Sequence, residues 1–177
     1  MTTNERYPSQ YESWLTLKDG REVFLRPILR TDGPLLVDLF NNLSSQSVYL
    51  RFLSPLHALP EDLLYRVAHI NYDSEFALVA VIKEDGRDAI IAVGRYAHDP
   101  HDNCTELAIA VRDDWQHVGL GKSLLAKTVA IGKEHGISRF ESVISPQNNI
   151  MMKTLESLGY EVNYFSRSGV YQVEILV

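Results

Sequence analysis

The stretch DDWQHVGLGKSLLAK, residues 113–127, joins a glycine-containing turn to a segment whose apolar residues recur at helical spacing. The start of a helix attracts phosphate groups, because its first N–H groups have no intrahelical partner and carry the positive end of the helix dipole. The stretch therefore predicts a phosphate-binding turn ahead of a helix. It leaves the ligand open, since nucleotides and other phosphate carriers share this chemistry.

Two nucleotide-binding motifs each fail at one position. A P-loop has the pattern G-x-x-x-x-G-K-[ST], and the tail GKS at 121–123 would require a glycine where the chain has Gln116. A dinucleotide fingerprint G-x-G-x-x-G beginning at Gly119 would require a third glycine where the chain has Leu124. Both nucleotide interpretations are therefore rejected.

The composition is that of one folded, acidic domain. The 177 residues are 45% hydrophobic and 23% charged, and 17 basic against 23 acidic residues give a formal net charge of −6. This charge disfavours a general nucleic-acid binder. Cys104 is the only cysteine, which excludes a disulfide framework and a cysteine zinc cluster. Because no apolar run resembles a signal peptide or a membrane span, we expect a cytoplasmic protein with no nucleic-acid or membrane partner.

The order of patterned segments predicts an α/β fold. Residues 1–14 are polar and are expected to form a flexible arm, followed by a single domain over 15–177. Strands are expected at 21–28, in a hairpin over 75–99 that turns at Asp85-Gly86, and at 105–111, 139–144, 160–165 and 169–177. Helices are expected within 31–43, 44–52, 59–70, 120–135 and 148–159. This order predicts a mixed sheet of about seven strands with helices on both faces.

The hexapeptide QHVGLG at 116–121 matches Q/R-x-x-G-x-G/A and resembles the pyrophosphate loop of the GNAT N-acetyltransferase superfamily. The segments KDGREVFLRPI, SVYLRFLSPL, NYDSEFALVAVI, TELAIAVRDDWQHVGLGKSLL and SPQNNIMMKTLESLGY are similar, in order and spacing, to the acetyltransferase domain of bacterial Pat-type protein lysine acetyltransferases. The resemblance covers about residues 15–177. It implies a mostly antiparallel sheet that is splayed in the middle, and acetyl-CoA as co-substrate without a metal.

The resemblance also implies which residues hold the coenzyme. The backbone of the loop would bind the pyrophosphate, the backbone of the strand before it would contact the pantetheine arm, and two residues near 150 would contact the pantetheine region. The alternatives are a glycine turn that only tightens packing, and an asparagine that only caps its helix. These candidate residues are Gln116, His117, Val118, Gly119, Leu120, Gly121 and Lys122 in the loop, Ile109, Ala110 and Val111 in the strand, and Asn148 and Met151 in the helix.

Glu106 is the candidate catalytic base. A lysine amine has a reference pKa near 10.4, so reaching its neutral form at pH 7 costs about 4.6 kcal/mol, and a neighbouring carboxylate can accept the proton during the reaction. By the same resemblance, Glu106 occupies the position of the general-base glutamate of Pat-type domains. Strand alternation puts it on the same face as Ala108 and Ala110, whose small side chains leave room for a substrate, provided that no bulge interrupts the strand. The alternative is an ordinary strand glutamate paired with a cation.

By the same resemblance, Leu155 occupies the position where many family members carry a tyrosine that protonates the leaving thiolate. No general acid is therefore assigned. Tyr160 is close in sequence, but it is expected to pack at the start of a strand.

The segment HDPHDNC at 98–104 contains possible metal ligands, but a turn between strands is expected to be polar, and no metal site is predicted. Arg51 and Phe52 resemble a segment that the family carries near the substrate. The alternative is that they only pack the end of their helix on the core.

These observations predict an N-acetyltransferase that transfers the acetyl group of acetyl-CoA to a protein lysine by direct attack in a ternary complex. One alternative is the same chemistry on a small amine or a peptide N-terminus. The other is a coenzyme A-binding regulatory module without catalysis. The expected partner is a protein with an accessible lysine, for which an acyl-CoA synthetase is a candidate. The acyl-chain preference and the oligomeric state stay open.

Overall fold

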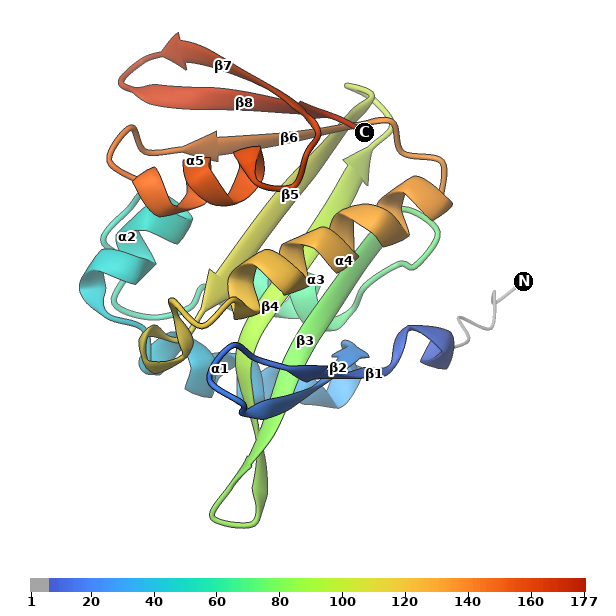
Figure 1. Ribbon diagram of the computed structural model, residues 1–177, viewed down its shortest axis with the longest axis vertical. Helices are drawn as coiled ribbons and strands as arrows, with labels where there is room; N and C mark the ends of the chain where they lie inside the picture. The colour runs from blue at the N-terminus through green and yellow to red at the C-terminus, as the bar shows by residue number, and fades with distance from the viewer. Residues whose placement is uncertain (1–6) are drawn as a thin grey trace.

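A computed structural model describes residues 7–177 (Figure 1), and these form a mixed eight-stranded sheet. The strand order is β1-β2-β3-β4-β5-β6-β8-β7, and every neighbouring pair is antiparallel except β5 and β6. The predicted mixed, mostly antiparallel α/β sheet is confirmed, with one strand more than expected. The strands are β1 (Ser13–Thr16), β2 (Glu22–Pro27), β3 (Glu75–Glu84), β4 (Arg87–Asp99), β5 (Cys104–Val111), β6 (Arg139–Ile144), β7 (Glu161–Arg167) and β8 (Val170–Leu176).

Helices cover both faces of the sheet. One face carries α1 (Gly33–Asn41), α2 (Ser45–Phe52) and α3 (Glu61–Ala68), and the other carries α4 (Leu120–Glu134) and α5 (Asn149–Glu156). Short 3-10 helices lie at Ser9–Tyr11, Arg30–Asp32 and Asp113–Trp115. Figure 1 shows α4 crossing in front of β3 and β4. No helix within residues 7–177 combines the length and apolar character that crossing a bilayer would require.

Side-chain alternation along β3 separates two hydrophobic cores. Phe76 and Leu78 pack in the larger core with α4, whereas Ala77 and Val79 pack in the smaller core with α1. Successive side chains of a strand point to opposite faces of the sheet. A strand buried on both faces therefore reads as the continuous apolar run FALVAVI seen at 76–82.

Helix α4 lies very close to the sheet near its C-terminal end. A Cβ atom built on Gly132 would lie 2.4 Å from Cζ of Phe140 and 3.3 Å from Cε1 of Tyr96. Only a residue without a side chain permits this approach. The glycine therefore fixes how deeply α4 sits on β4 and β6.

The N-terminal segment is more ordered than the expected arm of residues 1–14. Residues 1–6 lie outside the described part of the chain, but Ser9–Tyr11 form a 3-10 helix and β1 begins at Ser13. The Tyr11 hydroxyl lies 3.0 Å from Nε2 of His135, and its ring packs edge-on against Phe76. This segment is tied down by residues distant in sequence, which its own polar composition does not reveal.

Strands β5 and β6 diverge, and the sheet forks between them. Glu106 of β5 is in register with Glu141 of β6, and the Ser142 hydroxyl donates a 2.6 Å hydrogen bond to the Leu107 carbonyl oxygen. Within residues 7–177 no register pair joins the two strands beyond this point. Figure 1 shows β6, β8 and β7 fanning away from the other strands. The splay implied by the resemblance is thus present, and it creates an opening inside the sheet.

Candidate active site

A cleft of about 1120 Å³ occupies the fork between β5 and β6. Its walls come from β4, β5, β6, α2, α3, α5 and the turn before α4, together with the turn between β1 and β2. Most of the residues predicted for the site line this cleft. They are Glu106, Ile109, Ala110, Val111, Gln116, His117, Gly119, Gly121, Lys122, Asn148 and Met151.

Val118 and Leu120 are placed differently from the other loop residues. The Leu120 side chain is fully buried in the larger core, and Val118 packs partly against that core. The Val118 carbonyl oxygen also accepts a 3.2 Å hydrogen bond from the Lys18 N–H. Their side chains therefore anchor the turn, and only their backbone groups remain for a ligand.

The turn before α4 presents backbone donors to the cleft. His117 and Gly119 have φ angles of 63° and 87°, and the helix starts directly afterwards. The Ser123 N–H donates to the Gly119 carbonyl oxygen at 3.1 Å, so the N–H groups of the three preceding residues have no intrahelical acceptor. Together with the helix dipole and the exposed Lys122, these donors form an anion site that suits a diphosphate.

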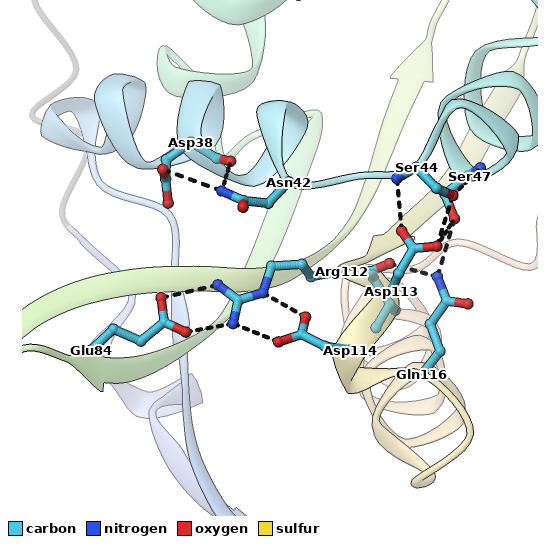
Figure 2. A network of polar contacts seen from close by, with 10 residues as sticks. Asp38, Asn42, Ser44, Ser47, Glu84, Arg112, Asp113, Asp114 and Gln116 are labelled. Atoms are coloured by element: carbon cyan, nitrogen blue, oxygen red, sulfur yellow. Dashed lines mark hydrogen bonds and ion pairs between the residues drawn. The ribbon is translucent and has the colours of Figure 1, made fainter.

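A polar network holds this turn against α2 (Figure 2). The Asp113 carboxylate accepts hydrogen bonds from the Ser44 N–H at 2.9 Å, from the Ser44 hydroxyl at 2.7 Å and from the Ser47 hydroxyl at 3.0 Å. The Gln116 side-chain amide donates to the Val111 carbonyl oxygen at 2.9 Å and to the Ser47 oxygen at 3.3 Å. Burial alone would raise the pKa of Asp113, but the hydrogen bonds from Ser44 and Ser47 outweigh it and hold this pKa below its usual value. Gln116 thus braces the loop with its side chain.

Arg112 ties the end of β5 to β3 in the same region (Figure 2). Its guanidinium donates to Asp114 through Nε at 2.7 Å, and to Glu84 through Nη1 at 3.0 Å. The hydrogen bonds from Arg112 lower the pKa of both carboxyl groups. Sequence reasoning missed this connection, because Glu84 ends a different strand 28 positions earlier.

The turn between β1 and β2 adds two residues that sequence reasoning also missed. Lys18 lines the cleft, and its stem packs on Gly119, where a Cβ atom would lie 3.3 Å from Lys18 Cε. The Arg21 guanidinium lies over the Trp115 ring, 3.7 Å from its centroid. Lys18 brings a second cation to the anion site. No local pattern points to it, since it precedes the loop by about a hundred residues.

Strand β5 presents backbone groups to the fork at every second residue. The Arg112 N–H donates to the Ile91 carbonyl oxygen of β4 at 2.8 Å, and the β4–β5 register continues without interruption. Backbone groups alternate between the two edges of a strand. Ala110 therefore directs its backbone to β4 and lines the cleft with its methyl group, whereas Ile109 and Val111 face the fork. The Val111 carbonyl oxygen already accepts a hydrogen bond from the Gln116 side chain. The groups left for a ligand are the N–H groups of Ile109 and Val111 and the Ile109 carbonyl oxygen.

Glu106 stands at the vertex of the fork with its side chain exposed to the cleft. It shares a face with Ala108 and Ala110, because the β4–β5 register runs without a bulge from Cys104 to Val111. Arg51 of α2 is the cation that acts on it electrostatically. Burial lowers the pKa of the Arg51 guanidinium to about 10, an effect that Glu106 opposes and Arg95 reinforces.

Helix α5 closes the cleft on the side of β6. The Asn148 side-chain oxygen accepts a 3.1 Å hydrogen bond from the Met151 N–H, so this residue caps the helix and lines the cleft at once. Leu155, at the position of the family tyrosine, is fully buried. Tyr160 lies directly before β7 and packs against the larger core, with Lys133 Nζ 5.1 Å from its ring centroid. Neither residue offers a proton to the cleft.

The segment at 98–104 is organised by ordinary turn contacts. His98 Nδ1 lies 2.9 Å from the Thr105 hydroxyl, and the His101 N–H donates to the Asp99 carboxylate at 2.8 Å. Among residues 7–177 no three His, Cys, Asp or Glu side chains gather in a way that could hold a metal ion.

A family model described as the acetyltransferase (GNAT) family matches residues 40–160 of this chain. An acetyltransferase of Pseudomonas aeruginosa is 29% identical over 150 residues, covering 84% of this chain and 81% of that protein. Acetyltransferase Pat of Mycolicibacterium smegmatis is 29% identical over 147 residues. That match covers 81% of this chain but 42% of the relative, so the chain spans less than half of the length of that protein. The crystal structure of the GNAT domain of S. lividans PAT is 29% identical, with a TM-score of 0.87, and the match covers 97% of this chain and 100% of that domain.

Proposed function

Since this chain belongs to the acetyltransferase (GNAT) family, we propose that it transfers the acetyl group of acetyl-CoA to the side-chain amine of a protein lysine. The observation that carries this proposal is the position of Glu106. Its carboxylate stands at the vertex of the fork, between the free edge of β5 and the wall formed by α2. A base placed there lies between a coenzyme that enters along the edge and an amine that approaches from the helices.

The coenzyme is held by backbone groups at two places. The pyrophosphate binds the free N–H groups at the start of α4, with Lys122 and Lys18 supplying positive charge. The pantetheine arm extends β5 as an added strand, hydrogen-bonded to the Ile109 carbonyl oxygen and the Val111 N–H. Asn148 and Met151 border the arm from α5. A small residue at position 121 lets the diphosphate approach the helix.

The reaction is a direct attack on the thioester. The amine nitrogen forms a bond to the acetyl carbonyl carbon, the carbon–sulfur bond breaks, and the amine proton passes to the Glu106 carboxylate. The Ile109 N–H, the free donor of β5 nearer to Glu106, polarises the carbonyl oxygen while it gains negative charge. The departing thiolate takes a proton from water. Its conjugate acid has a reference pKa near 8.5, so it leaves without a protein acid, in agreement with the burial of Leu155.

A protein lysine is proposed as the acceptor because the chain is similar to Pat acetyltransferases over most of its length. An acyl-CoA synthetase is a candidate protein substrate. Reaction in the cytoplasm belongs to the same proposal, as the single cysteine is compatible with a reducing compartment. The alternatives are a small amine or a peptide N-terminus as acceptor, and a coenzyme A-binding regulatory module. An ionisable glutamate at the fork favours catalysis over the last of these.

The test is to treat a cell lysate with the purified protein and isotopically labelled acetyl-CoA. We expect label on lysine ε-amines by peptide mass spectrometry, and free thiol released in proportion. Label confined to protein N-termini or to small amines would reassign the acceptor. Coenzyme binding without release of thiol would identify a regulatory module.

A further inference from the structure

Two arginines share the wall of the cleft next to Glu106. Arg95 of β4 is directly opposite Ala108 of β5 in the antiparallel register, and directly opposed residues point to the same face of a sheet. It therefore lies on the face that carries Glu106. Arg51 of α2 lines the same cleft and interacts electrostatically with both Glu106 and Arg95.

The charges of these arginines are poorly compensated within residues 7–177. Arg95 Nε is buried without a hydrogen-bond partner, and the guanidinium reaches only Glu75, at 3.9 Å. Arg51 has no hydrogen bond or ion pair in this part of the chain and contacts the Phe52 ring at 4.9 Å. Arg51 is partly buried, and this burial lowers the pKa of its guanidinium, which means that its positive charge is costly where it stands. Buried charges in folded proteins are ordinarily paired.

On one side the two arginines have apolar surroundings. Both also line a side pocket of about 60 Å³ that adjoins the cleft behind Ala108 and Ala110. The rest of its lining is apolar, with Leu36, Leu39, Phe40, Leu43, Phe52, Leu59, Leu63, Val67 and Val93. Two guanidiniums in such an apolar setting suit a carboxylate, which can accept several charge-assisted hydrogen bonds at once.

The position of the pair indicates which substrate brings the carboxylate. The coenzyme follows the edge of β5, whereas Arg51 and Arg95 stand on the face that α2 and α3 cover, beside the base. This is the side from which the amine must reach Glu106. Two cations there also repel a lysine ammonium, and an acidic group close to that lysine offsets the repulsion.

We propose that Arg51 and Arg95 bind a carboxylate of the acceptor, so that the protein selects lysines flanked by aspartate or glutamate. This selection rests on the proposed acetyl transfer to a protein lysine.

The test uses two capped peptides with one central lysine, flanked by glutamate in one and by glutamine in the other. Thiol release from acetyl-CoA gives kcat/KM for each peptide. With the unmodified protein we expect the acidic peptide to be preferred by on the order of tenfold, and Arg51→Met to bring this ratio close to one. Arg87→Met is the matched control, because Arg87 is exposed at the β3–β4 hairpin; it should leave the ratio unchanged. Equal rates with both peptides, or a preference that survives Arg51→Met, would overturn the proposal.

Two further measurements keep the outcome unambiguous. Thermal unfolding with coenzyme A should show more stabilisation by the acidic than by the neutral peptide, and Arg51→Met should remove this difference. That readout tests carboxylate binding even if no lysine is acetylated, which would be a failure of the proposed function alone. Replacing acetyl-CoA by succinyl-CoA tests the donor. Faster succinyl transfer that is lost in Arg51→Met would assign the carboxylate to the donor and overturn the assignment to the acceptor.

Discussion

Glu106 of β5 and Glu141 of β6 stand opposite each other at the last register pair before the two parallel strands separate. Both side chains line the cleft, but the Glu141 carboxylate has its own cation, Arg139, at 3.3 Å, whereas Glu106 is exposed to the cleft beside Arg51. Two glutamates at one position of the sheet therefore have different surroundings. Within residues 7–177 Glu106 forms no salt bridge, which leaves its carboxylate available to an acceptor amine.

Replacing Glu106 by glutamine should remove the base while retaining shape and polarity. We expect kcat to fall by about 10²–10⁴-fold, the usual contribution of a general base. The affinity for acetyl-CoA should change little, because the proposed coenzyme contacts are backbone groups. The loss should shrink as the pH rises toward the lysine pKa of about 10.4, where more of the amine is already neutral.

The control is Glu174→Gln. Glu174 of β8 pairs with Arg139 of β6 and is not part of the cleft lining. A loss of the same size at every pH would assign Glu106 a structural or positioning role. Full activity of Glu106→Gln at neutral pH would remove it from the mechanism.

Coenzyme A should protect the fold against heat much better than ATP. The turn at 116–121 offers a helix start and two positive-φ residues to a diphosphate, but it lacks the first glycine of a P-loop. Differential scanning fluorimetry with each ligand at the same concentration measures the difference. Equal or greater protection by ATP with magnesium would contradict acetyl-CoA as the ligand of this turn.

Gly121→Asp should weaken acetyl-CoA binding by electrostatic repulsion while the fold persists. A Cβ atom at this position meets only Val111 Cγ2 at 3.5 Å and Ile109 Cδ1 at 4.0 Å, which are ordinary contacts. A carboxylate in the first turn of a helix is also favourable for the helix itself. Gly121→Ala is the control that adds the Cβ atom without charge. Calorimetric titration should show a clear loss for aspartate and a much smaller one for alanine, and unchanged binding of the aspartate variant would put the pyrophosphate elsewhere.

Much of this architecture can be predicted from local patterns. The apolar run of β3, the Asp85-Gly86 turn and the cap at Asn148 each specify their element within a few residues. The face of the sheet on which the Glu106 side chain lies also follows from strand alternation alone, because β5 has no bulge. The fork itself does not follow from local pattern, since β6 reads like any other strand, and it was expected only from family resemblance.

Features that depend on distant segments escaped prediction. The strand β1 is four residues long at the edge of the sheet, and its hydrogen-bonding partner β2 decides its conformation. Lys18 contacts the loop only in the folded chain, so no spacing in the sequence predicts this contact. The pairing of Arg112 with Glu84 likewise requires β3 and β5 to be placed first.

Gly132→Ala should destabilise the protein without affecting the cleft directly. The new methyl group would overlap the Phe140 ring, and overpacking of this kind costs about 1–3 kcal/mol of unfolding free energy. For a domain of this size the midpoint of thermal unfolding should fall by roughly 2–4 °C per kcal/mol. Combining the change with Phe140→Leu should recover part of the loss, as a double-mutant cycle would show. Strict additivity of the two changes would contradict a direct clash.

Asp113→Asn should loosen the connection between the loop and α2 in a pH-dependent way. The pKa of Asp113 is below its usual value, so the carboxylate contributes stability that is present above the unfolded-state pKa of about 3.9 and is lost as the pH falls through the folded-state value. Urea unfolding should therefore show a deficit for the variant at pH 7 that disappears in acid.

The KM for acetyl-CoA should rise in the same variant, because the loop is less firmly held. Asp102→Asn, on the exposed turn before β5, should show neither effect. A deficit of constant size down to low pH would mean that the hydrogen bonds from Ser44 and Ser47 do not depend on the charge.

The free edge of β5 has a consequence for solubility. Unpaired strand edges are templates for the addition of foreign strands, and proteins usually keep them short, charged or covered. Here such an edge lies in the interior of the sheet, where β6 and α5 flank it and leave a slot rather than an open flank. A foreign strand that paired with this edge would have to fit its side chains between β5 and β6, next to α5, whereas a chain without side chains, such as pantetheine, would not. We therefore expect the geometry proposed for coenzyme binding also to limit self-association through β5.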